Sequence, residues 1–175
     1  MIKIGTSSGG GEVWDDKDRS DIVQIFISWT EGTKRLNFIQ FLYVENGTLV
    51  LSEKRGGMPG NKFKTVKFDY PSEFLTRLSC RGYTSYCGLN YVSSITFGTN
   101  RGTYGPFGQA KESDTFYDFD MGQDRPFGGF YGTTRDGRLE SIGVYVRPIA
   151  TLNNTTTEVE QEEEEEEEDN SHYSD

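Results

Sequence analysis

The sequence predicts an all-β fold, and three observations support this prediction. Glycine is frequent, with 21 residues, and aromatic residues make up 14% of the chain. Roughly ten short apolar or alternating segments are separated by turn-forming residues, about 8 to 15 residues apart. Helix-favouring runs are scarce, and only residues 71–74 are suited to start a single helical turn. Such a pattern indicates strands arranged in a sandwich, a barrel or a prism.

The first half of the chain contains four expected strands. Residues 22–28 are apolar, and residues 35–44 are rich in Phe, Ile and Tyr. Asn46 and Gly47 then form a dipeptide typical of a type I′ hairpin turn, so residues 48–51 are expected to return as a strand. The alternating residues 65–70 are expected to place Val66, Phe68 and Tyr70 on one face.

The second half of the chain contains five further expected strands. They are residues 74–78, 92–97, 114–121, 127–131 and 139–146. In the last strand Ile142, Val144 and Val146 share a face, which predicts that this strand lies against a core.

Charge divides the chain into two regions. The formal net charge is −10, but residues 158–175 hold 11 acidic residues and no Lys or Arg. The 17 acidic and 18 basic residues of the preceding region nearly cancel. We therefore expect a folded domain at residues 1–149 and a disordered acidic tail at residues 150–175, because the tail has too little apolar surface to fold.

Several functional classes are not favoured by the sequence. We find no apolar leader and no apolar run of membrane-spanning length, so we expect a protein of the cytoplasm or nucleus. There Cys80 and Cys87 are expected to be reduced thiols. Two cysteines and one histidine do not supply the four ligands of a structural zinc, and no cofactor is expected. A nearly neutral domain with an acidic tail does not favour nucleic-acid binding.

An enzyme is not expected either. The single histidine, His172, lies in the tail, so a Ser-His-Asp or Cys-His site is missing from the domain. The carboxylate pairs Asp15/Asp16 and Asp118/Asp120 are the remaining candidates for acid–base chemistry. Asp118 and Asp120 alternate on an expected strand and are interpreted as solvent-facing residues.

Four stretches of residues 1–148 resemble the jacalin-related lectins in their order and spacing. Residues 9–16 combine glycines with Trp-Asp-Asp, and residues 56–57 are Gly-Gly, followed by Pro-Ser-Glu-Phe-Leu at 71–75. Residues 94–97 are Ser-Ile-Thr-Phe, and Tyr-Gly-Pro-Phe-Gly follows at 104–108. Residues 127–132 are Phe-Gly-Gly-Phe-Tyr-Gly, and Ile-Gly-Val-Tyr-Val ends the pattern at 142–146. Each motif is weak by itself, but the ordered set is specific.

The resemblance implies a β-prism I fold with three four-stranded Greek-key sheets around a pseudo-threefold axis. Asp15 and Asp16 then belong to a structural motif, and most glycines serve the sharp corners of the prism. The aromatic residues expected in the core are Trp14, Phe97, Phe107, Phe130 and Tyr145.

The resemblance also implies a metal-independent hexose site at one end of the prism. Two loops form it in this family, a glycine loop and a Gly-x-x-x-Asp loop before the last strand. Backbone N–H groups donate to the sugar hydroxyls and a carboxylate accepts from them. The matching residues in this chain are Gly10, Gly11, Asp136, Gly137, Arg138, Leu139 and Glu140.

This candidate site departs from the family pattern at two positions. Glu140 stands where the family has Asp, and Asp136 stands where it has Gly. Ion pairs between Asp136 and Arg138, or between Arg135 and Glu140, are possible in this loop. The alternative interpretation is that Asp136-Gly137 is only a hairpin turn and that Glu140 faces solvent.

Two functions follow from these alternatives. The first is a lectin of the mannose/glucose class, binding such glycans weakly per site and gaining strength by self-association. The second is a jacalin-fold protein-interaction module with impaired sugar binding, like plant stress and defence relatives, some linked to restricting virus movement. In that case the acidic tail is a candidate docking segment for a protein partner.

Overall fold

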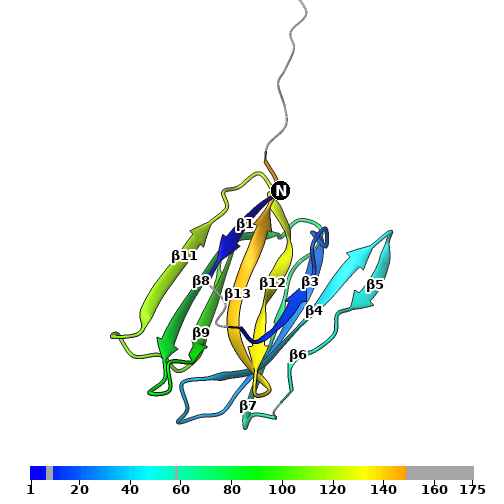
Figure 1. Cartoon of the computed structure of the whole chain (residues 1–175). Helices are drawn as coiled ribbons and strands as arrows, with labels where there is room; N and C mark the ends of the chain where they lie inside the picture. Colours follow the sequence, from blue (N-terminus) through cyan, green and yellow to red (C-terminus); the bar gives the residue numbers. More distant parts are fainter. Residues whose placement is uncertain (7–9, 58, 149–175) are drawn as a thin grey trace, which may run out of the picture.

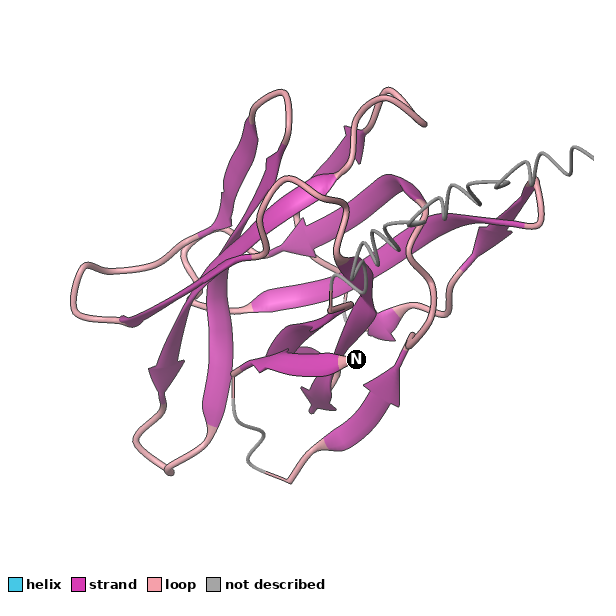
Figure 2. Ribbon diagram, turned by 90° about the horizontal axis from the view of Figure 1, so that it is seen from above, coloured by secondary structure: helices cyan, strands magenta, loops and turns pink. Residues whose placement is uncertain are grey.

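The computed structural model describes residues 1–6, 10–57 and 59–148 of the chain. Every regular element in these ranges is a strand, and the strands form three antiparallel sheets around a shared core (Figures 1 and 2). The acidic tail expected at residues 150–175 lies outside the described residues. The prism expected from the resemblance is confirmed, although one sheet has five strands, not four.

One sheet contains both the first and the last strands of the domain. Its strand order is β1-β13-β12-β2, and its members are β1 (Ile2–Gly5), β2 (Glu12–Asp15), β12 (Phe127–Arg135) and β13 (Arg138–Val146). The N-terminus pairs with the end of β13, through Ile2 and Val146. The β12–β13 turn lies at the opposite end of the prism (Figure 1).

The other two sheets are built from consecutive parts of the chain. One has the order β5-β4-β3-β7 with β6 paired to β4, comprising β3 (Ile22–Trp29), β4 (Leu36–Glu45), β5 (Thr48–Leu51), β6 (Arg55–Gly56) and β7 (Lys62–Lys67). The last has the order β10-β9-β8-β11, comprising β8 (Leu75–Thr84), β9 (Asn90–Thr99), β10 (Thr103–Gly108) and β11 (Thr115–Asp120).

The strands predicted from hydrophobic pattern are present, most with shifted ends. The return strand at Thr48–Leu51 is confirmed, and both residues of its turn have positive φ, 51° at Asn46 and 77° at Gly47. The single helical turn expected at residues 71–74 is present slightly earlier in the chain: the Glu73 amide bonds to the Asp69 carbonyl four residues before it, and no longer helix follows. Tyr70 does not share the buried face of Val66 and Phe68: it is 38% exposed and lies in the turn at residues 70–72.

Four strands were not predicted, and β10 shows why. It contains Gly105 and Pro106, and proline cannot donate a hydrogen bond to a sheet. The structure tolerates this because β10 is an edge strand with a bulge between Tyr104 and Phe107. The short strands β1, β2 and β6 likewise have too few residues to show a pattern.

Each sheet contributes one phenylalanine to the centre of the core. Phe41 of β4, Phe97 of β9 and Phe130 of β12 are all 0% exposed. The rings of Phe41 and Phe130 stack with centroids 4.2 Å apart, and Phe97 meets Phe130 edge-on at 6.3 Å. Aromatic pairs in these geometries stabilise beyond simple burial. Four of the five predicted core aromatics are buried, and Phe107 is only partly buried against the core.

The carboxylates of the Trp-Asp-Asp motif hold the sheets together. Asp16 is 3% exposed and accepts hydrogen bonds from Arg55 Nη2 at 2.6 Å and from the Tyr43 hydroxyl at 3.2 Å. Asp15 accepts one from the Tyr145 hydroxyl at 2.5 Å. Both carboxylates thus have hydroxyl or guanidinium partners within the fold. Asp118 and Asp120 are exposed on β11, as predicted.

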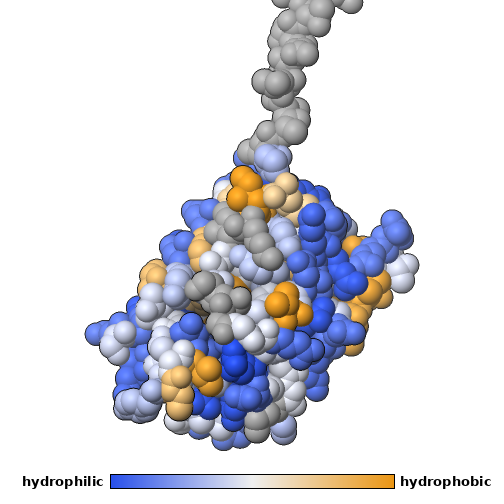
Figure 3. Space-filling view, in the orientation of Figure 1, coloured by the Kyte–Doolittle hydropathy of each residue, from blue (hydrophilic) through white to orange (hydrophobic). Residues whose placement is uncertain are grey.

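The outer surface is mainly hydrophilic. The face in Figure 3 shows scattered small apolar areas among polar side chains. The described residues include no apolar helix of membrane-spanning length. Within them, no three His, Cys, Asp or Glu side chains gather into a group suited to a metal ion.

Candidate functional site

The β12–β13 turn is a two-residue hairpin. Asp136 and Gly137 separate the two strands and have φ values of 51° and 68°. Positive φ at both positions is the requirement of a type I′ turn, which the Asp-Gly dipeptide meets. The turn is fixed to a neighbouring sheet, because the Gly57 amide donates to the Gly137 carbonyl at 3.0 Å. The interpretation of Asp136-Gly137 as a hairpin turn is therefore confirmed.

A bulge next to this turn directs Glu140 into the protein. Thr133 pairs with Ser141 and Thr134 pairs with Leu139, so Glu140 is an extra residue on β13. Leu139, Glu140 and Ser141 are all buried, and β13 stays buried as far as Tyr145, so both faces of this strand are covered. Glu140 is 2% exposed, and the alternative interpretation of it as a solvent-facing residue is wrong.

Both carboxylate oxygens of Glu140 have partners. Oε2 accepts from the Gly11 amide at 2.9 Å, and Oε1 accepts from Arg135 Nε at 2.9 Å. Burial opposes the charged form, but hydrogen bonds from Arg135, Thr133 and Gly11 outweigh it and lower the pKa of Glu140. The expected Arg135–Glu140 ion pair is confirmed, and Glu140 is held as a carboxylate.

The glycine loop meets Glu140 at a distance that only glycine permits. A Cβ on Gly11 would lie 2.4 Å from Glu140 Oε2 and 2.4 Å from the Thr134 carbonyl oxygen. At Gly10, φ is +100°, and a Cβ there would lie 3.5 Å from Arg135 Nη2. The two loops expected to share a site are thus in contact, with Arg135 between them.

The other predicted site residues do not converge on Glu140. Asp136 Oδ2 accepts a hydrogen bond from the Tyr91 hydroxyl at 3.4 Å. An ion pair between Arg138 and the Asp136 carboxylate was expected. Instead Arg138 Nη1 donates to the backbone carbonyl of Asp136 at 3.3 Å. Leu139 is 0% exposed and belongs to the core. Only Gly10, Gly11 and Glu140 come together.

Among the described residues, two hollows of different size lie near the turn. The hollow that Glu140 lines has a volume of about 40 Å³, which holds about one water and is far too small for a hexose. A larger open hollow of about 400 Å³ is lined by Asp136, Gly137, Thr134, Glu12 and Arg55, whose guanidinium is paired with Asp16 and Glu53. This hollow offers carboxylates and backbone groups to a polar ligand.

Sequence reasoning missed Thr133, Tyr91 and Gly57 as supports of the turn. Thr133 bonds to the Ser141 hydroxyl at 2.7 Å and supports Glu140. Tyr91 and Gly57 lie on other sheets, 45 and 80 residues from their partners. No local pattern in the sequence marks such contacts, because they depend on how the sheets meet.

Comparison with protein families gives one match that covers most of the chain. Residues 3–145 match the family model described as "Jacalin-like lectin domain". The chain is 37% identical over 140 residues to "Protein RESTRICTED TEV MOVEMENT 1" of Arabidopsis thaliana, covering 79% of each chain. It is 31% identical over 151 residues to a "Mannose/glucose-specific lectin" of Parkia platycephala, covering 85% of this chain and 32% of that protein.

Solved structures show the same architecture. A mannose-specific jacalin-related lectin from Morus nigra, solved in complex with mannose, superposes with a TM-score of 0.71 and 26% identity. The superposition covers 84% of this chain and 94% of that one. The mannose-binding lectin from Champedak gives a TM-score of 0.71 with 28% identity, covering 84% of this chain and 97% of the other.

Proposed function

The chain belongs to the jacalin-like lectin domain family, and from this premise we propose that it is a carbohydrate-binding lectin of the mannose/glucose class that needs no metal. The observation that carries this proposal is the contact between Gly11 and Glu140, which lie 129 residues apart. It brings the glycine loop and the β12–β13 loop together at one end of the prism. Those are the two loops that the family resemblance assigns to a hexose.

The proposed ligand is held by hydrogen bonds. A hexose presents neighbouring hydroxyls that both donate and accept, which suits carboxylates and backbone amides. The open hollow beside Asp136 and Gly137 supplies the space, and the small hollow that Glu140 lines is separate from it. Because Glu140 already has two internal partners, we expect weak binding per site, strengthened by self-association.

The same burial supports a second candidate function. The Glu140 side chain is 0% exposed and accepts from Arg135 and Gly11, so a sugar hydroxyl reaches it only when the groups that cover it move. On this basis the second candidate is a protein-interaction module with impaired sugar binding, acting in stress or defence. The similarity to "Protein RESTRICTED TEV MOVEMENT 1", which extends over most of both chains, supports this candidate.

We propose a binding role and no catalytic one. Asp15 and Asp16 are engaged by Tyr145, Tyr43 and Arg55, which leaves them serving the fold. A location in the cytoplasm or nucleus, and a protein partner for the acidic tail, remain part of this proposal.

Calorimetric titration of the full chain with methyl mannoside and methyl glucoside tests the proposal. Saturable binding that is lost in Glu140→Ala supports the lectin function and the proposed site. Binding that survives Glu140→Ala keeps the lectin and contradicts the site. Absence of binding, in a protein shown by circular dichroism to be folded, contradicts the lectin and favours the second candidate.

A further inference from the structure

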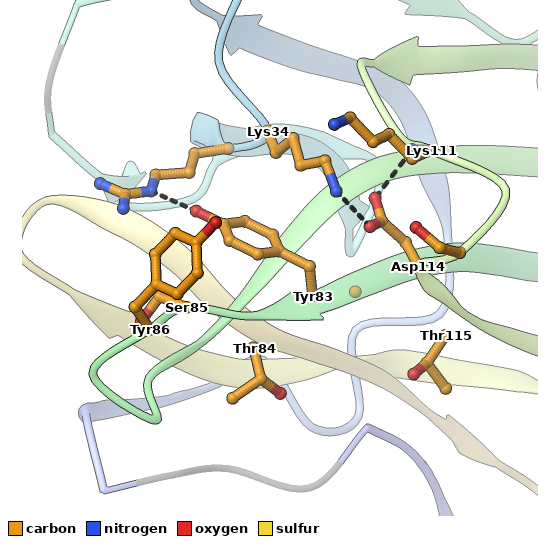
Figure 4. Close-up of a pocket in the computed structure, with 11 residues that line it drawn as sticks. Lys34, Tyr83, Thr84, Ser85, Tyr86, Lys111, Asp114 and Thr115 are labelled. Atoms are coloured by element: carbon orange, nitrogen blue, oxygen red, sulfur yellow. Dashed lines mark hydrogen bonds and ion pairs between the residues drawn. The ribbon is translucent and has the colours of Figure 1, made fainter.

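A second polar depression lies near the β12–β13 turn, on the side of the β8–β9 sheet. Two open hollows, of about 650 Å³ and about 510 Å³, share Lys34, Arg35 and Tyr83 in their linings. We call the combined depression the basic groove. Its larger part lies between Lys34, the end of β8 at Tyr83 to Tyr86, and residues Lys111 to Thr115 (Figure 4). Its smaller part reaches Arg138, the residue after the turn.

The groove is strongly positive within a nearly neutral domain. Its linings include four cations, Lys34, Arg35, Lys111 and Arg138, and one carboxylate, Asp114. Asp114 is 6% exposed and is already neutralised, because Lys34 Nζ bonds to its Oδ1 at 2.5 Å.

The two remaining oxygen contacts of Asp114 are also internal. Its Oδ2 accepts from the Ser93 hydroxyl at 3.1 Å and the Lys111 amide at 2.9 Å. Nearby carboxylates outside the lining are Asp136, which accepts from Tyr91 and acts electrostatically on Arg35, and the exposed Glu112. Lys34 is paired with Asp114, so Arg35, Lys111 and Arg138 are the lining cations that an anion can approach.

Aromatic and hydroxyl groups line the groove together with the cations. Tyr86 is fully exposed, and Tyr83 lies beneath Lys34, whose Nζ is 5.2 Å from the ring centroid. Hydroxyls come from Thr84, Ser85, Ser113 and Thr115. Exposed aromatic rings and hydroxyls suit the faces and edges of sugar rings, and cations suit acidic substituents.

We propose that the basic groove binds an acidic saccharide, one whose sugar units carry carboxylate groups. Lys111 and Arg35 pair with the carboxylates, and Tyr86 packs against a ring. The proposal rests on the proposed function only in taking the ligand to be a saccharide. Arg138 lines the groove and directly follows the turn that borders the proposed hexose hollow.

Titration of the full chain with an oligogalacturonate tetramer tests this proposal, with neutral mannotetraose as the uncharged probe. Lys111→Glu and Tyr86→Ala are the test variants, since both side chains are exposed and neither anchors the core. Lys64→Glu is the matched control, because Lys64 is exposed and lines neither hollow. All variants are first checked for an unchanged melting temperature.

The expected result is binding of oligogalacturonate that weakens by about tenfold or more in Lys111→Glu, the loss expected for a charge-assisted contact. Tyr86→Ala is expected to weaken it as well, and Lys64→Glu is expected to change it little. The affinity is also expected to fall when NaCl is raised from about 0.05 M to about 0.5 M. Equal effects of Lys111→Glu and Lys64→Glu, or no binding at low salt, overturn the proposal.

An acidic peptide is the rival occupant. A synthetic peptide with the sequence of residues 158–175, which contains 11 acidic residues, serves as that probe. If it binds as tightly as oligogalacturonate and depends on Lys111 but not on Tyr86, the groove selects carboxylates and not saccharides, and the proposal is wrong. Methyl mannoside is titrated in parallel. Its binding to the unmodified chain, and the loss of that binding in Glu140→Ala, test the proposed hexose site separately from the groove.

Discussion

The amide of Gly11 donates a hydrogen bond of 2.9 Å to Oε2 of Glu140, a residue 129 positions later in the chain. The contact joins the loop before β2 to the bulge of β13. It is short enough that a side chain on Gly11 has no room. The candidate hexose site and the contact between the glycine loop and β13 therefore depend on the same pair of residues.

Restoring the family pattern is expected to strengthen sugar binding. In Asp136→Gly/Glu140→Asp, the shorter carboxylate is withdrawn from Arg135, and glycine accepts the positive φ of 51° at position 136 without strain. We expect the affinity for methyl mannoside to rise about tenfold, equivalent to about 1.4 kcal/mol. Calorimetry checks this, with Asp136→Gly alone as the control. An unchanged affinity in the double variant would favour the protein-interaction candidate.

Replacing Gly11 is expected to damage both the site and the fold. In Gly11→Ala the new Cβ would lie 2.4 Å from two oxygen atoms, so the loop must move away from β13. We expect the free energy of unfolding to fall by about 1–3 kcal/mol, since a buried carboxylate loses a donor. Gly57→Ala is the control, because nothing lies within 4 Å of its Cβ position. Urea unfolding measures both, and similar losses would refute the steric argument.

Acid is expected to destabilise the protein through buried carboxylates. Burial acts to raise the pKa of Glu73, but hydrogen bonds from the Asp69 amide, Thr99 and Tyr104 lower it below the ordinary value of 4.5. Because the pKa of Glu73 is lower in the folded state, its ionised carboxylate contributes stability above about pH 4.5. This contribution is lost as the pH falls below that value toward the folded-state pKa.

Glu73→Gln isolates this contribution. The variant is expected to be less stable at pH 7, and its melting temperature is expected to fall less steeply between about pH 5 and pH 3. Thermal unfolding across this range makes the comparison. Parallel curves for the two proteins would show that Glu73 does not contribute to acid unfolding.

Truncation of the central aromatic residue is expected to be costly. Phe130 is 0% exposed and contacts Phe41 and Phe97, so Phe130→Ala leaves a cavity where three sheets meet. A loss of about 3–5 kcal/mol is expected. Phe116→Ala removes a ring that is 55% exposed and is expected to change stability by less than about 1 kcal/mol. Denaturant titration compares the two, and comparable losses would contradict this description of the core.

The two cysteines are expected to differ in reactivity. Burial raises the pKa of Cys80 to about 12, whereas Cys87 is exposed. Since the thiolate is the reactive form, a disulfide reagent at pH 8 should label only Cys87 in the folded protein and both residues in denaturant. Cys87→Ser provides the control, and rapid labelling of that variant would show that Cys80 is accessible.

The fold was largely predictable because its signals are local. Hydrophobic segments such as Thr48–Leu51 and turn dipeptides such as Asn46-Gly47 identify strands and hairpins without reference to the rest of the chain. The strand β10 was missed because its local sequence, with Gly105 and Pro106, carries no strand signal, and it forms only by pairing with β9.

The orientation of Glu140 could not be predicted from alternation along β13. The bulge at Glu140, between Leu139 and Ser141, shifts the side-chain alternation of β13 relative to a regular strand. A bulge is decided by how two strands fit each other in the sheet. Its consequence, a buried carboxylate bonded to Gly11 and Arg135, is visible only in three dimensions.

The sequence by itself determined the all-β class, the separation of a nearly neutral domain from an acidic tail in charge, and the family motifs that place Gly10, Gly11 and Glu140 in one candidate site. Only the tertiary structure decided that Glu140 is buried and paired, that Asp136 bonds to Tyr91, and that Lys34, Arg35, Lys111 and Arg138 line one groove. The physical reason is that propensity and pattern act over a few residues. Exposure, hydrogen-bond partners and local charge depend on residues brought together from three different sheets.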